Sequence, residues 1–421
     1  LLQFCVGECL DAGAAALRLA GFDTTESSQQ QGECQHPCLS FTRQIAADGG
    51  AMTMNSVHAY SLLGMLIGSL WLGPASATLQ APAGYLQGQL MLKSSDRATD
   101  CPPLNVYRGE LDIPSKYVQS EKSKDVIDDD NEARYEAMSA PMSDLQQLSA
   151  SLTDKLFKGK GTEQDLQCLR QHWLAWASAG ALLQPTKQAV GKAIRKWTLA
   201  AIASNYLKIK LNLPEDDPSF PKVERQELER WLGLVAGEVV KDYSHRKPEQ
   251  INNHDYWAAW GVMTTAVVLD RQDLFDWAGA VYQTAMLQIK ADGVLPNELK
   301  RRSRALSYHN FALQPLVLLA AFGEANGQHW LRADNAALQR LAALVIRNLD
   351  DSSALAQEAE AKQVKESLRE HGRLAWLAPY IAISGNREWL PLLKSLSTLK
   401  MTRLGGDLSY HYLRNEPGFT Q

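Results

Sequence analysis

Apolar residues recur every three or four positions along most of the chain from about Asp144 onward. This spacing places them on one face of an α-helix, and no segment shows a convincing strand-like alternation. The pattern is interrupted at residues 214–218, 291–293 and at Gly327, where Pro, Asp and Gly gather. Helices are therefore predicted over residues 143–158, 163–181, 185–210, 222–243, 252–269, 271–291, 302–324, 333–349, 354–371 and 373–396. The predicted fold class is all-α.

Each predicted helix must bury its apolar face against its neighbours. A series of helical hairpins can do this as an open solenoid or by closing into an α/α toroid. The chain has no repeat of fixed length, which argues against a regular solenoid. Periodicity alone leaves the closure of the helices open.

Residues 78–136 differ in composition from the helical part. They are rich in Pro, Ser and charged residues, include the acidic run Asp128–Asp130 and show little apolar periodicity. We expect an extended N-terminal arm followed by a mobile lid loop. Together with the helical part over 137–421, this arm forms a single domain spanning 78–421.

A segment near the N-terminus has the pattern of an export signal. Residues 54–77 combine a short polar start, an apolar run over 62–72 and a final Ala-Ser-Ala, which is typical of a signal peptide cleaved after an A-x-A site. We expect cleavage near Ala77 and a periplasmic mature chain. The apolar run is too short to anchor the chain, so no membrane insertion is predicted after cleavage. Residues 1–53 precede the signal and are interpreted as a non-native upstream segment.

Loss of the first 77 residues would change the charge of the chain. They hold two of the 43 basic residues and six of the 47 acidic ones, so the mature chain is electrically balanced, and no nucleic-acid partner is predicted. It keeps two cysteines, Cys101 and Cys168. In an oxidising compartment these are expected to form a disulfide, which would stabilise the fold by about 4 kcal/mol. Two buried thiols are the alternative.

Two short blocks contain the residues that could perform chemistry. The first is Asn252-Asn253-His254-Asp255-Tyr256-Trp257-Ala258-Ala259-Trp260. If a helix begins at Asn252, a favoured N-cap, then Asn253, Trp257 and Trp260 lie along one stripe with His254 beside it. Polar tips above aromatic rings suit a sugar polymer. The alternative is that both tryptophans are core residues and Asn252 is only a cap.

The second block is Asn297-Glu298-Leu299-Lys300-Arg301-Arg302-Ser303-Arg304-Ala305-Leu306-Ser307-Tyr308-His309. Arg301, Arg304 and Tyr308 share a face if all three are helical, with Arg301 and Tyr308 about 10 Å apart along the axis. A long guanidinium side chain can span much of that distance, so both groups could reach one sugar ring. The alternative is a solvated basic face with Tyr308 as a packing residue.

Both blocks resemble the active-site signatures of the alginate lyases, specifically the periplasmic mannuronate lyases. The resemblance extends from about Ala81 to Leu404. Further matching blocks are Ser115-Lys116-Tyr117, Trp173-x-x-Trp176-Ala177-x-Ala179-Gly180-Ala181-Leu182, Arg195-Lys196-Trp197, Gly293-x-Leu295-Pro296-Asn297-Glu298-Leu299, Tyr308-His309-Asn310 and Arg403-Leu404-Gly405-Gly406. This resemblance implies an incomplete α/α toroid.

The resemblance also implies roles for individual residues. The positions that match catalytic residues are Asn253, His254, Arg301 and Tyr308. The positions that match or neighbour substrate-binding residues are Lys116, Tyr117, Trp197, Trp257 and Arg403. Apart from the resemblance, a groove for a polyanion needs local positive charge, and the basic residues expected to line it are Lys116, Lys192, Arg195, Lys196, Lys300, Arg301, Arg302 and Arg304. Asp255 departs from the family, in which Ser is common after the His; an acid there could tune His254 or face solvent.

The implied reaction is β-elimination in a mannuronate-rich alginate, with no cofactor and no metal. Asn253 and Arg301 would neutralise the uronate carboxylate, and Tyr308 would protonate the leaving oxygen at C4. The base that removes the C5 proton would be Tyr308 itself or His254. The histidines show no paired metal-ligand spacing. The resemblance leans toward a periplasmic role in clearing stray polymer, beside an alginate synthesis and export complex.

Two other functions remain open at the level of sequence. A glycoside hydrolase on the same fold would need two carboxylates in the cleft, and Glu298 is a candidate for only one of them. A non-catalytic polysaccharide-binding or export-scaffold protein could use the same aromatic and basic residues.

Overall fold

The structure is a computed structural model that describes residues 78–86, 88–90, 92–94, 101–120, 126–364 and 367–413. The chain divides into two units, Leu1–Leu72 and Gly73–Gln421. All described residues belong to the second unit. The predicted upstream segment 1–53 and signal peptide 54–77 lie outside the described residues.

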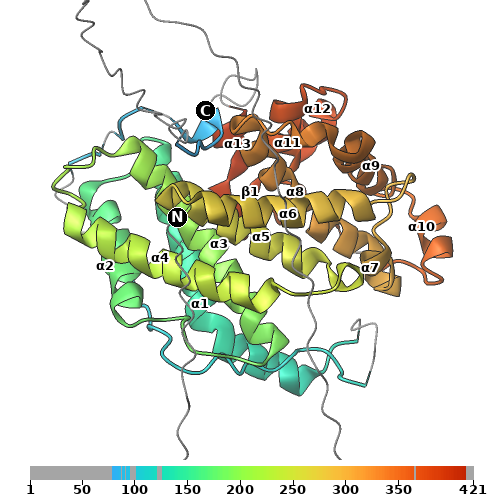
Figure 1. The fold of residues 1–421 in the computed structure, drawn as a ribbon, viewed down its shortest axis with the longest axis horizontal. Coiled ribbons are helices and arrows are strands. Elements are labelled where there is room, and N and C mark those ends of the chain that lie inside the picture. Colours follow the sequence, from blue (N-terminus) through green and yellow to red (C-terminus); the bar gives the residue numbers. More distant parts are fainter. Residues whose placement is uncertain are drawn as a thin grey trace, which may run out of the picture. The chain divides into compact units, whose positions relative to one another are not determined.

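Helices are the dominant element of the described residues, with very little strand, as the sequence predicts (Figure 1). The helices are η1 (Ala83–Tyr85), α1 (Asp129–Phe157), α2 (Glu163–Ser178), α3 (Ala189–Asn212), α4 (Lys222–Tyr243), η2 (Pro248–Gln250), α5 (Asn253–Leu269), α6 (Gln272–Gln288), α7 (Pro296–Leu299), η3 (Arg302–Arg304), α8 (Ala305–Ala325), η4 (Trp330–Arg332), α9 (Ala333–Arg347), α10 (Ser353–Glu358), α11 (Leu377–Ser384), α12 (Leu390–Ser395), η5 (Thr402–Leu404) and α13 (Leu408–Tyr412), where η marks a 3₁₀-helix. Two strands, β1 (Lys400–Met401) and β2 (Gly406–Asp407), form a short antiparallel hairpin around η5.

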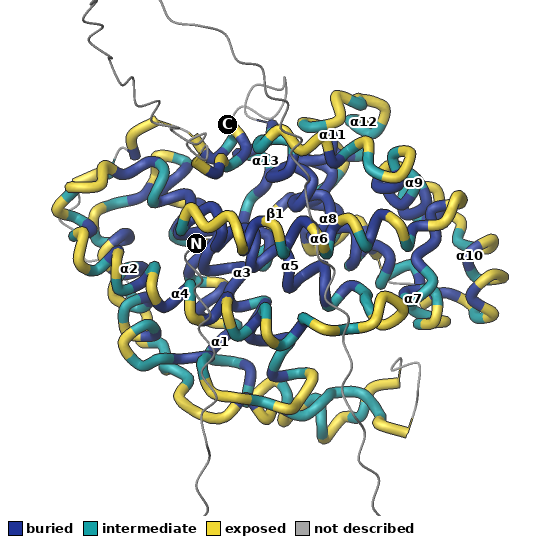
Figure 2. The backbone as a smooth tube through the Cα atoms, in the orientation of Figure 1, coloured by how far each residue is buried: buried dark blue, intermediate teal, exposed yellow. Residues whose placement is uncertain are grey.

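Helices α3, α5 and α8 are buried over most of their surface and form the inner layer (Figure 2). On α5 the run from Ala258 to Val268 is apolar on nearly all sides, which is the pattern of a helix surrounded by protein. Along the inner layer α1 packs on α3, α3 on α5, α5 on α8, and α8 on α11.

Helices α2, α4, α6 and α9 form the outer layer, and each buries a single face. On α4 the buried positions include Leu228, Trp231, Leu232 and Val235, at the three- and four-residue spacing of one helical stripe. Inner and outer helices alternate along the chain, and each outer helix packs against the inner helices that precede or follow it. This arrangement is an α/α toroid, so the predicted fold class is confirmed.

The amphipathic pattern locates the helices between residues 163 and 347 to within a few residues, but it fails at both ends of the toroid. The acidic run is part of α1 and not a loop: Asp128 caps the helix by accepting from the Asn131 backbone N–H at 2.9 Å. Acidic side chains in a first turn complement the helix dipole, which explains why a charged segment is helical here.

The helices predicted over 354–371 and 373–396 were wrong in extent. In their place are α10, a non-helical connection, α11 and α12. Gly372 has a left-handed backbone, with φ of +69°, and lies so close to the Lys400 carbonyl that a Cβ would clash with it. Glu360, two residues after the end of α10, and His371 also have left-handed backbones, with φ of 50° and 56°, and such positions interrupt a helix although the apolar spacing around them continues.

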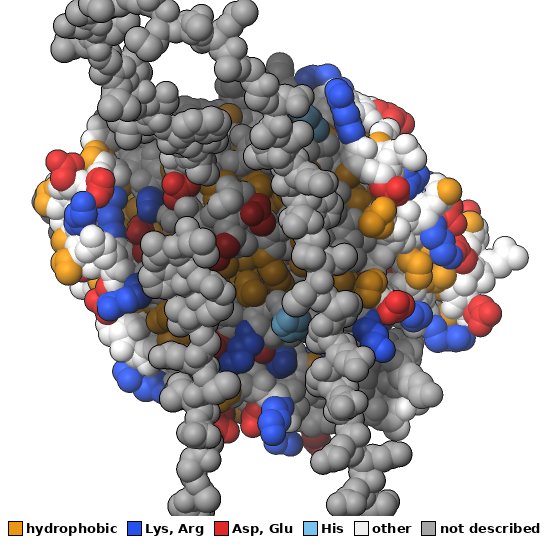
Figure 3. Space-filling view, in the orientation of Figure 1, with side chains coloured by type: hydrophobic (Ala, Val, Ile, Leu, Met, Phe, Trp, Pro, Cys, Tyr) orange, Lys and Arg blue, Asp and Glu red, His pale blue; other side chains and the backbone are white. Residues whose placement is uncertain are grey.

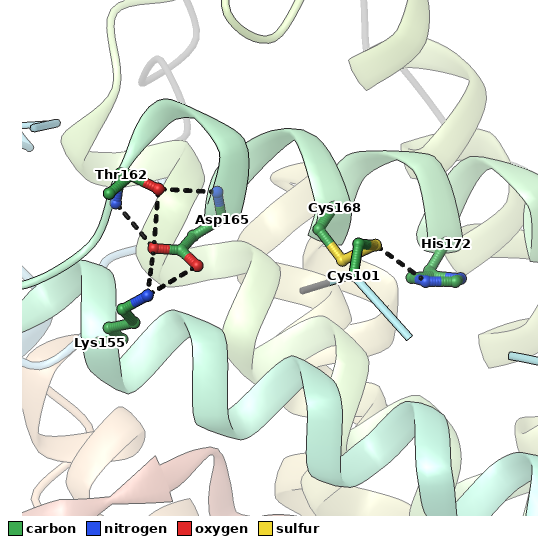
Figure 4. Close-up of a disulfide and its surroundings, with 6 residues drawn as sticks. All are labelled: Cys101, Lys155, Thr162, Asp165, Cys168 and His172. Atoms are coloured by element: carbon green, nitrogen blue, oxygen red, sulfur yellow. Dashed lines mark hydrogen bonds and ion pairs between the residues drawn. A yellow bond between two sulfur atoms is a disulfide. The ribbon is translucent and has the colours of Figure 1, made fainter. Parts of the chain in front are cut away.

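Several contacts fix the arm to the toroid, and two of them lie within residues 101–113. Cys101 and Cys168 form the predicted disulfide, with their Cα atoms 5.7 Å apart, and so connect the arm to α2 (Figure 4). Further along, Leu111 and Ile113 are fully buried, and the Leu111 carbonyl accepts from Thr186 Oγ1 at 3.1 Å. The segment that follows Ile113 is thereby held beside α3.

Helix α8, together with the preceding 3₁₀ turn, is long and apolar enough to cross a membrane by composition. However, 78% of its most apolar window is buried inside the protein. A core helix passes the same compositional test, and α8 packs against α5, α9 and α11 as such a helix does.

The contact between the arm and α3 can be tested with two glycines. We expect Gly191→Ala to destabilise the protein by about 1–3 kcal/mol, because its methyl group would meet the Leu111 carbonyl. Gly237→Ala is the matched control, since the α4 position is exposed with open space around it. That change should stabilise the protein by about 0.5–1 kcal/mol. Urea unfolding of both variants measures the difference, and equal effects would contradict the contact.

The disulfide closes a loop across a sequence separation of 67 residues. Replacing Cys101 and Cys168 together by Ser should lower the free energy of unfolding by about 4 kcal/mol. Chemical denaturation under oxidising conditions measures this. Under reducing conditions the wild type should lose the same amount while the double variant is unaffected; a wild type insensitive to reduction would argue for two thiols.

Candidate active site

A cavity of about 560 Å³ opens where the arm, the inner helices and the C-terminal hairpin meet. Its lining residues are Ser115, Lys116, Tyr117, Gln119, Tyr135, Ala189, Val190, Ala193, Trp197, Asn253, His254, Arg301, Arg304, Ser307, Tyr308, Asn310, Phe311, Gln314, Leu368, Arg373, Met401 and Arg403. The four predicted catalytic residues and four of the five predicted substrate-binding residues are among them. The structure therefore brings together positions that are up to about 290 residues apart in the chain.

Arg301 and Tyr308 are in direct contact. Arg301 Nη2 donates to Tyr308 Oη at 2.7 Å, and the guanidinium lies 3.9 Å from the centre of the tyrosine ring. The prediction that both residues extend one helical face was wrong: Arg301 precedes η3, and Arg302 has a left-handed backbone with φ of 49°. The bend and the 3₁₀ turn after it replace about one turn of α-helix and bring the guanidinium onto the ring.

Tyr308 is held as a phenol in the free protein. Burial raises its pKa above the ordinary value, the adjacent Arg301 cation lowers it, and the Tyr117 phenol, whose Oη lies 3.5 Å from that of Tyr308, raises it. Burial is the largest of these effects, so the neutral form is favoured at neutral pH. A phenolate formed during a reaction would be stabilised chiefly by Arg301.

Asn253 is held by a buried carboxyl group. Its backbone N–H donates to Glu298 Oε1 at 2.7 Å and its Nδ2 donates to Oε2 at 2.8 Å. Its Oδ1 is buried and has no hydrogen-bond partner among the described residues. Burial raises the pKa of Glu298 to about 7, against the bonds from Asn253 and the charge of Arg301, which lower it. Glu298 therefore orients the amide of Asn253 from the side away from the cavity, which Glu298 does not itself line.

His254 follows Asn253 in the first turn of α5. Asn252 caps this helix by accepting from the His254 backbone N–H at 2.9 Å, and Asp255 closes the cap by accepting from the Asn252 N–H at 2.9 Å. Asp255 is buried and paired with Arg246 at 2.6 Å, so it does not face solvent. His254 Nδ1 lies 2.8 Å from Lys196 Nζ. Burial and then the Lys196 charge lower the pKa of His254 far below its ordinary value, which keeps the ring neutral.

The remaining predicted binding residues come from three separate elements. Lys116 and Tyr117 belong to the arm, where Lys116 pairs with Glu132 of α1 at 3.1 Å and Tyr117 bridges to Ile127. The Arg403 guanidinium lies over the ring of Trp197 on α3, 4.0 Å from the centre of that ring. Arg403 reaches the cavity because η5 packs against α1, α3 and α8.

Trp257 is the predicted binding residue that does not line the cavity. It is fully buried, its Nε1 donates to the Phe311 carbonyl at 3.0 Å, and its ring packs on Phe311. Trp260 is likewise buried and donates to the Arg403 carbonyl at 3.0 Å. For these two tryptophans the alternative interpretation as core residues is correct, because an inner helix buries its whole circumference.

The expected basic lining was partly wrong. Arg195 and Lys196 are fully buried and do not line the cavity; Arg195 binds the Leu182 carbonyl and Asp242. Lys192, Lys300 and Arg302 also lie outside the lining. The cations that do line it are Lys116, Arg301, Arg304, Arg373 and Arg403. Elsewhere, basic and acidic side chains are interspersed over the face shown in Figure 3.

Sequence reasoning missed Arg373, whose carbonyl accepts from Asn310 Nδ2 and Gln314 Nε2 at 3.0 Å each. Asn310 in turn accepts from Trp376 Nε1 at 2.8 Å. The signal available in the sequence was Asn310 itself, which ends the recognised Tyr308-His309-Asn310 block. A polar side chain that faces inward from α8 needs a hydrogen-bond partner, and the backbone carbonyl of Arg373 is that partner.

The cavity lining contains no Asp, Glu or Cys among the described residues. Within the described part of the chain, one group has ligand atoms close enough for a metal ion: Cys101, Cys168 and His172. Its two sulfur atoms are bonded to each other, which removes the thiolates that would bind a metal (Figure 4). That the reaction needs no metal stays a prediction.

Comparison with known proteins gives a consistent result. Residues 112–355 match the family model described as "Alginate lyase". Alginate lyases from Pseudomonas syringae pv. syringae and Cobetia marina are 37% and 35% identical to the chain, covering 84% and 80% of it and 94% and 90% of the relatives. The alginate lyase of Pseudomonas aeruginosa is 35% identical, over 80% of the chain and 92% of the relative.

Solved structures also match. A variant of alginate lyase A1-III complexed with a tetrasaccharide superposes with a TM-score of 0.67 at 21% identity, covering 80% of this chain and 97% of that one. Alginate lyase A1-III from Sphingomonas species A1 gives a TM-score of 0.62 at 22% identity. At these identities the similarity concerns the fold alone, and it agrees with the helical toroid described above.

The buried Glu298 makes stability depend on pH. Its pKa is raised from 4.5 to about 7, so the unfolded chain loses this proton at lower pH than the folded protein does. Between about pH 4.5 and 7 the folded protein should therefore lose roughly 3 kcal/mol through this group as pH rises. Glu298→Gln removes the titration. Urea unfolding of both proteins at pH 5 and pH 8 should show the variant gaining on the wild type at pH 8, and a constant difference would contradict the raised pKa.

Proposed function

The chain belongs to the alginate lyase family, and we propose that it cleaves mannuronate-rich alginate by β-elimination. The products would be oligosaccharides with a 4-deoxy-4,5-unsaturated uronate at the non-reducing end. The observation that carries this proposal is the contact between Arg301 and Tyr308, which line the same cavity as Asn253 and His254.

The residues around the cavity fit the chemical steps of such an elimination. A cation beside the C6 carboxylate offsets its charge and favours removal of the C5 proton, and Arg301 can supply it while one of its N–H groups holds Tyr308. As electrons move to form the C4–C5 double bond, the C4–oxygen bond breaks and the leaving oxygen takes a proton from Tyr308. In mannuronate the C5 proton and the C4 oxygen lie on one face of the ring, so one phenol can serve both, which supports mannuronate as the substrate.

The charge of the cavity fits a polyuronate. Its lining has five cationic residues and no carboxylate among the described residues, although the chain as a whole has a net charge of −4. Focused positive charge in a cleft attracts an anionic polymer irrespective of net charge. Trp197 and Tyr135 add aromatic faces on which sugar rings can stack.

A glycoside hydrolase is disfavoured on the same grounds. Hydrolysis with two carboxylates needs both beside the glycosidic bond. Glu298, the one candidate, is 1% exposed and does not line the cavity, because both of its oxygens accept hydrogen bonds from Asn253.

The location proposed for the enzyme is the periplasm, where it would clear stray polymer during alginate synthesis and export. The disulfide between Cys101 and Cys168 supports an oxidising compartment. The signal-like pattern over residues 54–77 supports export. Detection of the protein in a periplasmic extract, with an N-terminus near Thr78, tests this location.

The reaction is tested by incubating the mature protein with polymannuronate and following ultraviolet absorbance of the unsaturated uronate. We expect absorbance to rise with polymannuronate and much more slowly with polyguluronate. Reducing ends without absorbance would indicate a hydrolase. Binding without either signal would indicate a non-catalytic protein, and equal rates on both polymers would contradict the proposed preference.

The role of Tyr308 is tested by Tyr308→Phe, which removes one oxygen and leaves the ring. The rate of elimination should fall at least about a thousandfold, because a positioned proton donor is lost, while the affinity for the polymer stays within about threefold. Tyr107→Phe is the matched control: its phenol donates to the Glu110 carbonyl, away from the cavity, and turnover should not change. Normal turnover in Tyr308→Phe would remove Tyr308 from the mechanism.

A further inference from the structure

Lys196 is a buried basic residue to which the proposed reaction assigns no role. It lies on α3 with no exposed surface, directly behind the cavity wall formed by Trp197 and His254. Its Nζ lies 2.9 Å from Tyr243 Oη and 2.8 Å from His254 Nδ1. It forms no ion pair with any residue that the structure describes. Since burying a cation is costly, its position calls for an explanation beyond packing.

The geometry leaves the two nitrogens of His254 in different surroundings. Nδ1 faces Lys196, whereas Nε2 makes no hydrogen bond to a described residue, and the side chain lines the cavity. In a neutral imidazole one nitrogen carries the proton and the other a lone pair, and the partner of one nitrogen decides the state of the other. The group bound to Nδ1 therefore decides what Nε2 presents to a ligand.

A lysine is a hydrogen-bond donor in either protonation state, whereas it can accept only as a neutral amine. The surroundings favour the donating arrangement. The Tyr243 and Trp197 rings lie 4.4 and 5.4 Å from Nζ and stabilise a cation. Tyr243 stays a neutral phenol, since burial raises its pKa, and its oxygen accepts from Lys196. Nδ1 of His254 is then the second acceptor for the N–H groups of Lys196.

The charged groups around Lys196 and His254 shift the pKa values of both side chains. Burial, the largest effect, and the nearby Arg246 and Arg403 lower the pKa of Lys196 well below its ordinary value, while Asp255 and Asp242 raise it. Both acids already have partners: Asp255 binds Arg246, and Asp242 binds Lys192 and Arg195. For His254, Lys196, Arg246 and Arg301 all oppose a positive charge on the ring. The ring is neutral, so its tautomer is the property that Lys196 can set.

We propose that Lys196 is a positioning residue: it donates to His254 Nδ1 and thereby fixes the tautomer in which Nε2 carries the proton and presents it to the cavity. Its relevance to catalysis rests on the proposed lyase function. In this tautomer His254 donates a hydrogen bond to the uronate and has no lone pair available there to remove a proton.

The assignment decides which residue is the base. With Nε2 protonated, the base is Tyr308: when substrate binds, its phenol first releases its proton to solvent, and the phenolate, stabilised by Arg301, then takes the C5 proton and returns it to the C4 oxygen. The C4–C5 double bond forms as the C4–oxygen bond breaks, and the elimination ends with the phenolate restored. His254 and Asn253 hold the substrate while its carboxylate accepts negative charge.

The tautomer is measured directly by nitrogen NMR of protein labelled with ¹⁵N in its histidine rings. The chain has nine histidines, and His254→Gln identifies the signals to assign. Without substrate at pH 7, Nδ1 of His254 should have the shift of an unprotonated nitrogen and Nε2 that of a protonated one. The reverse pattern, or a charged ring, would overturn the proposal.

Substitutions separate positioning from packing. In Lys196→Met, which keeps the length but lacks a donor, Nδ1 and Nε2 should show averaged shifts, and kcat should fall about a hundredfold with little change in KM. Lys196→Gln restores an N–H donor and should recover at least about tenfold of that loss. Lys192→Met is the matched control, one turn earlier on α3 and outside the cavity lining, and should leave both the tautomer and kcat unchanged.

Thermal unfolding of each variant accompanies these measurements. Loss of activity in Lys196→Met with an unchanged His254 tautomer would assign Lys196 a packing role and overturn the proposal. The NMR result is independent of activity, so the two proposals fail separately. If polymannuronate is not cleaved but Nε2 is protonated, the proposed function fails and the role of Lys196 in setting the tautomer stands. If it is cleaved but Nδ1 is protonated, the opposite holds.

Discussion

Helices α3 and α5 pack closely at Gly261, where any side chain would press against the α3 backbone. A Cβ there would lie 3.1 Å from the Lys196 carbonyl and 3.3 Å from the Ala200 backbone nitrogen. This approach brings Lys196 on α3 within hydrogen-bonding distance of His254 at the start of α5. Asn253 and the cap at Asn252 belong to the same turn. The positions of the polar groups at the base of the cavity thus depend on a close backbone contact between two buried helices.

The same burial has an electrostatic effect. Glu298, His254, Lys196 and Tyr308 all have pKa values displaced toward the neutral form, and in each case burial is the largest cause. Neutral groups at the base of the cavity leave the positive field to the arginines around it. Such a site can hold an anion while its proton donors keep their protons.

The sequence predicted the toroid and most of the cavity lining because two different signals agreed. Long apolar periodicity located helices such as 222–243, and the blocks around His254 and Tyr308 identified cavity residues. Periodicity could not tell a cavity-facing stripe from a core stripe, so Trp257 was misplaced. It also could not show that Arg301 lies outside α8, because the left-handed Arg302 has no residue-type signature. Lys196 and Glu298 contact residues 58 and 45 positions away, and such pairings exist only in the fold.

The attachment of the arm limits how the cavity can open. Leu111 and Ile113 are fully buried, and Tyr117 follows only four residues later. At roughly 3.5 Å per residue, the tyrosine can move no more than about 14 Å from Ile113 while that anchor holds. Tyr117 therefore stays at a high effective concentration beside Tyr308, whether or not a polymer is present. The entropic cost of placing this wall beside the cavity is therefore met when the protein folds and not when a polymer binds.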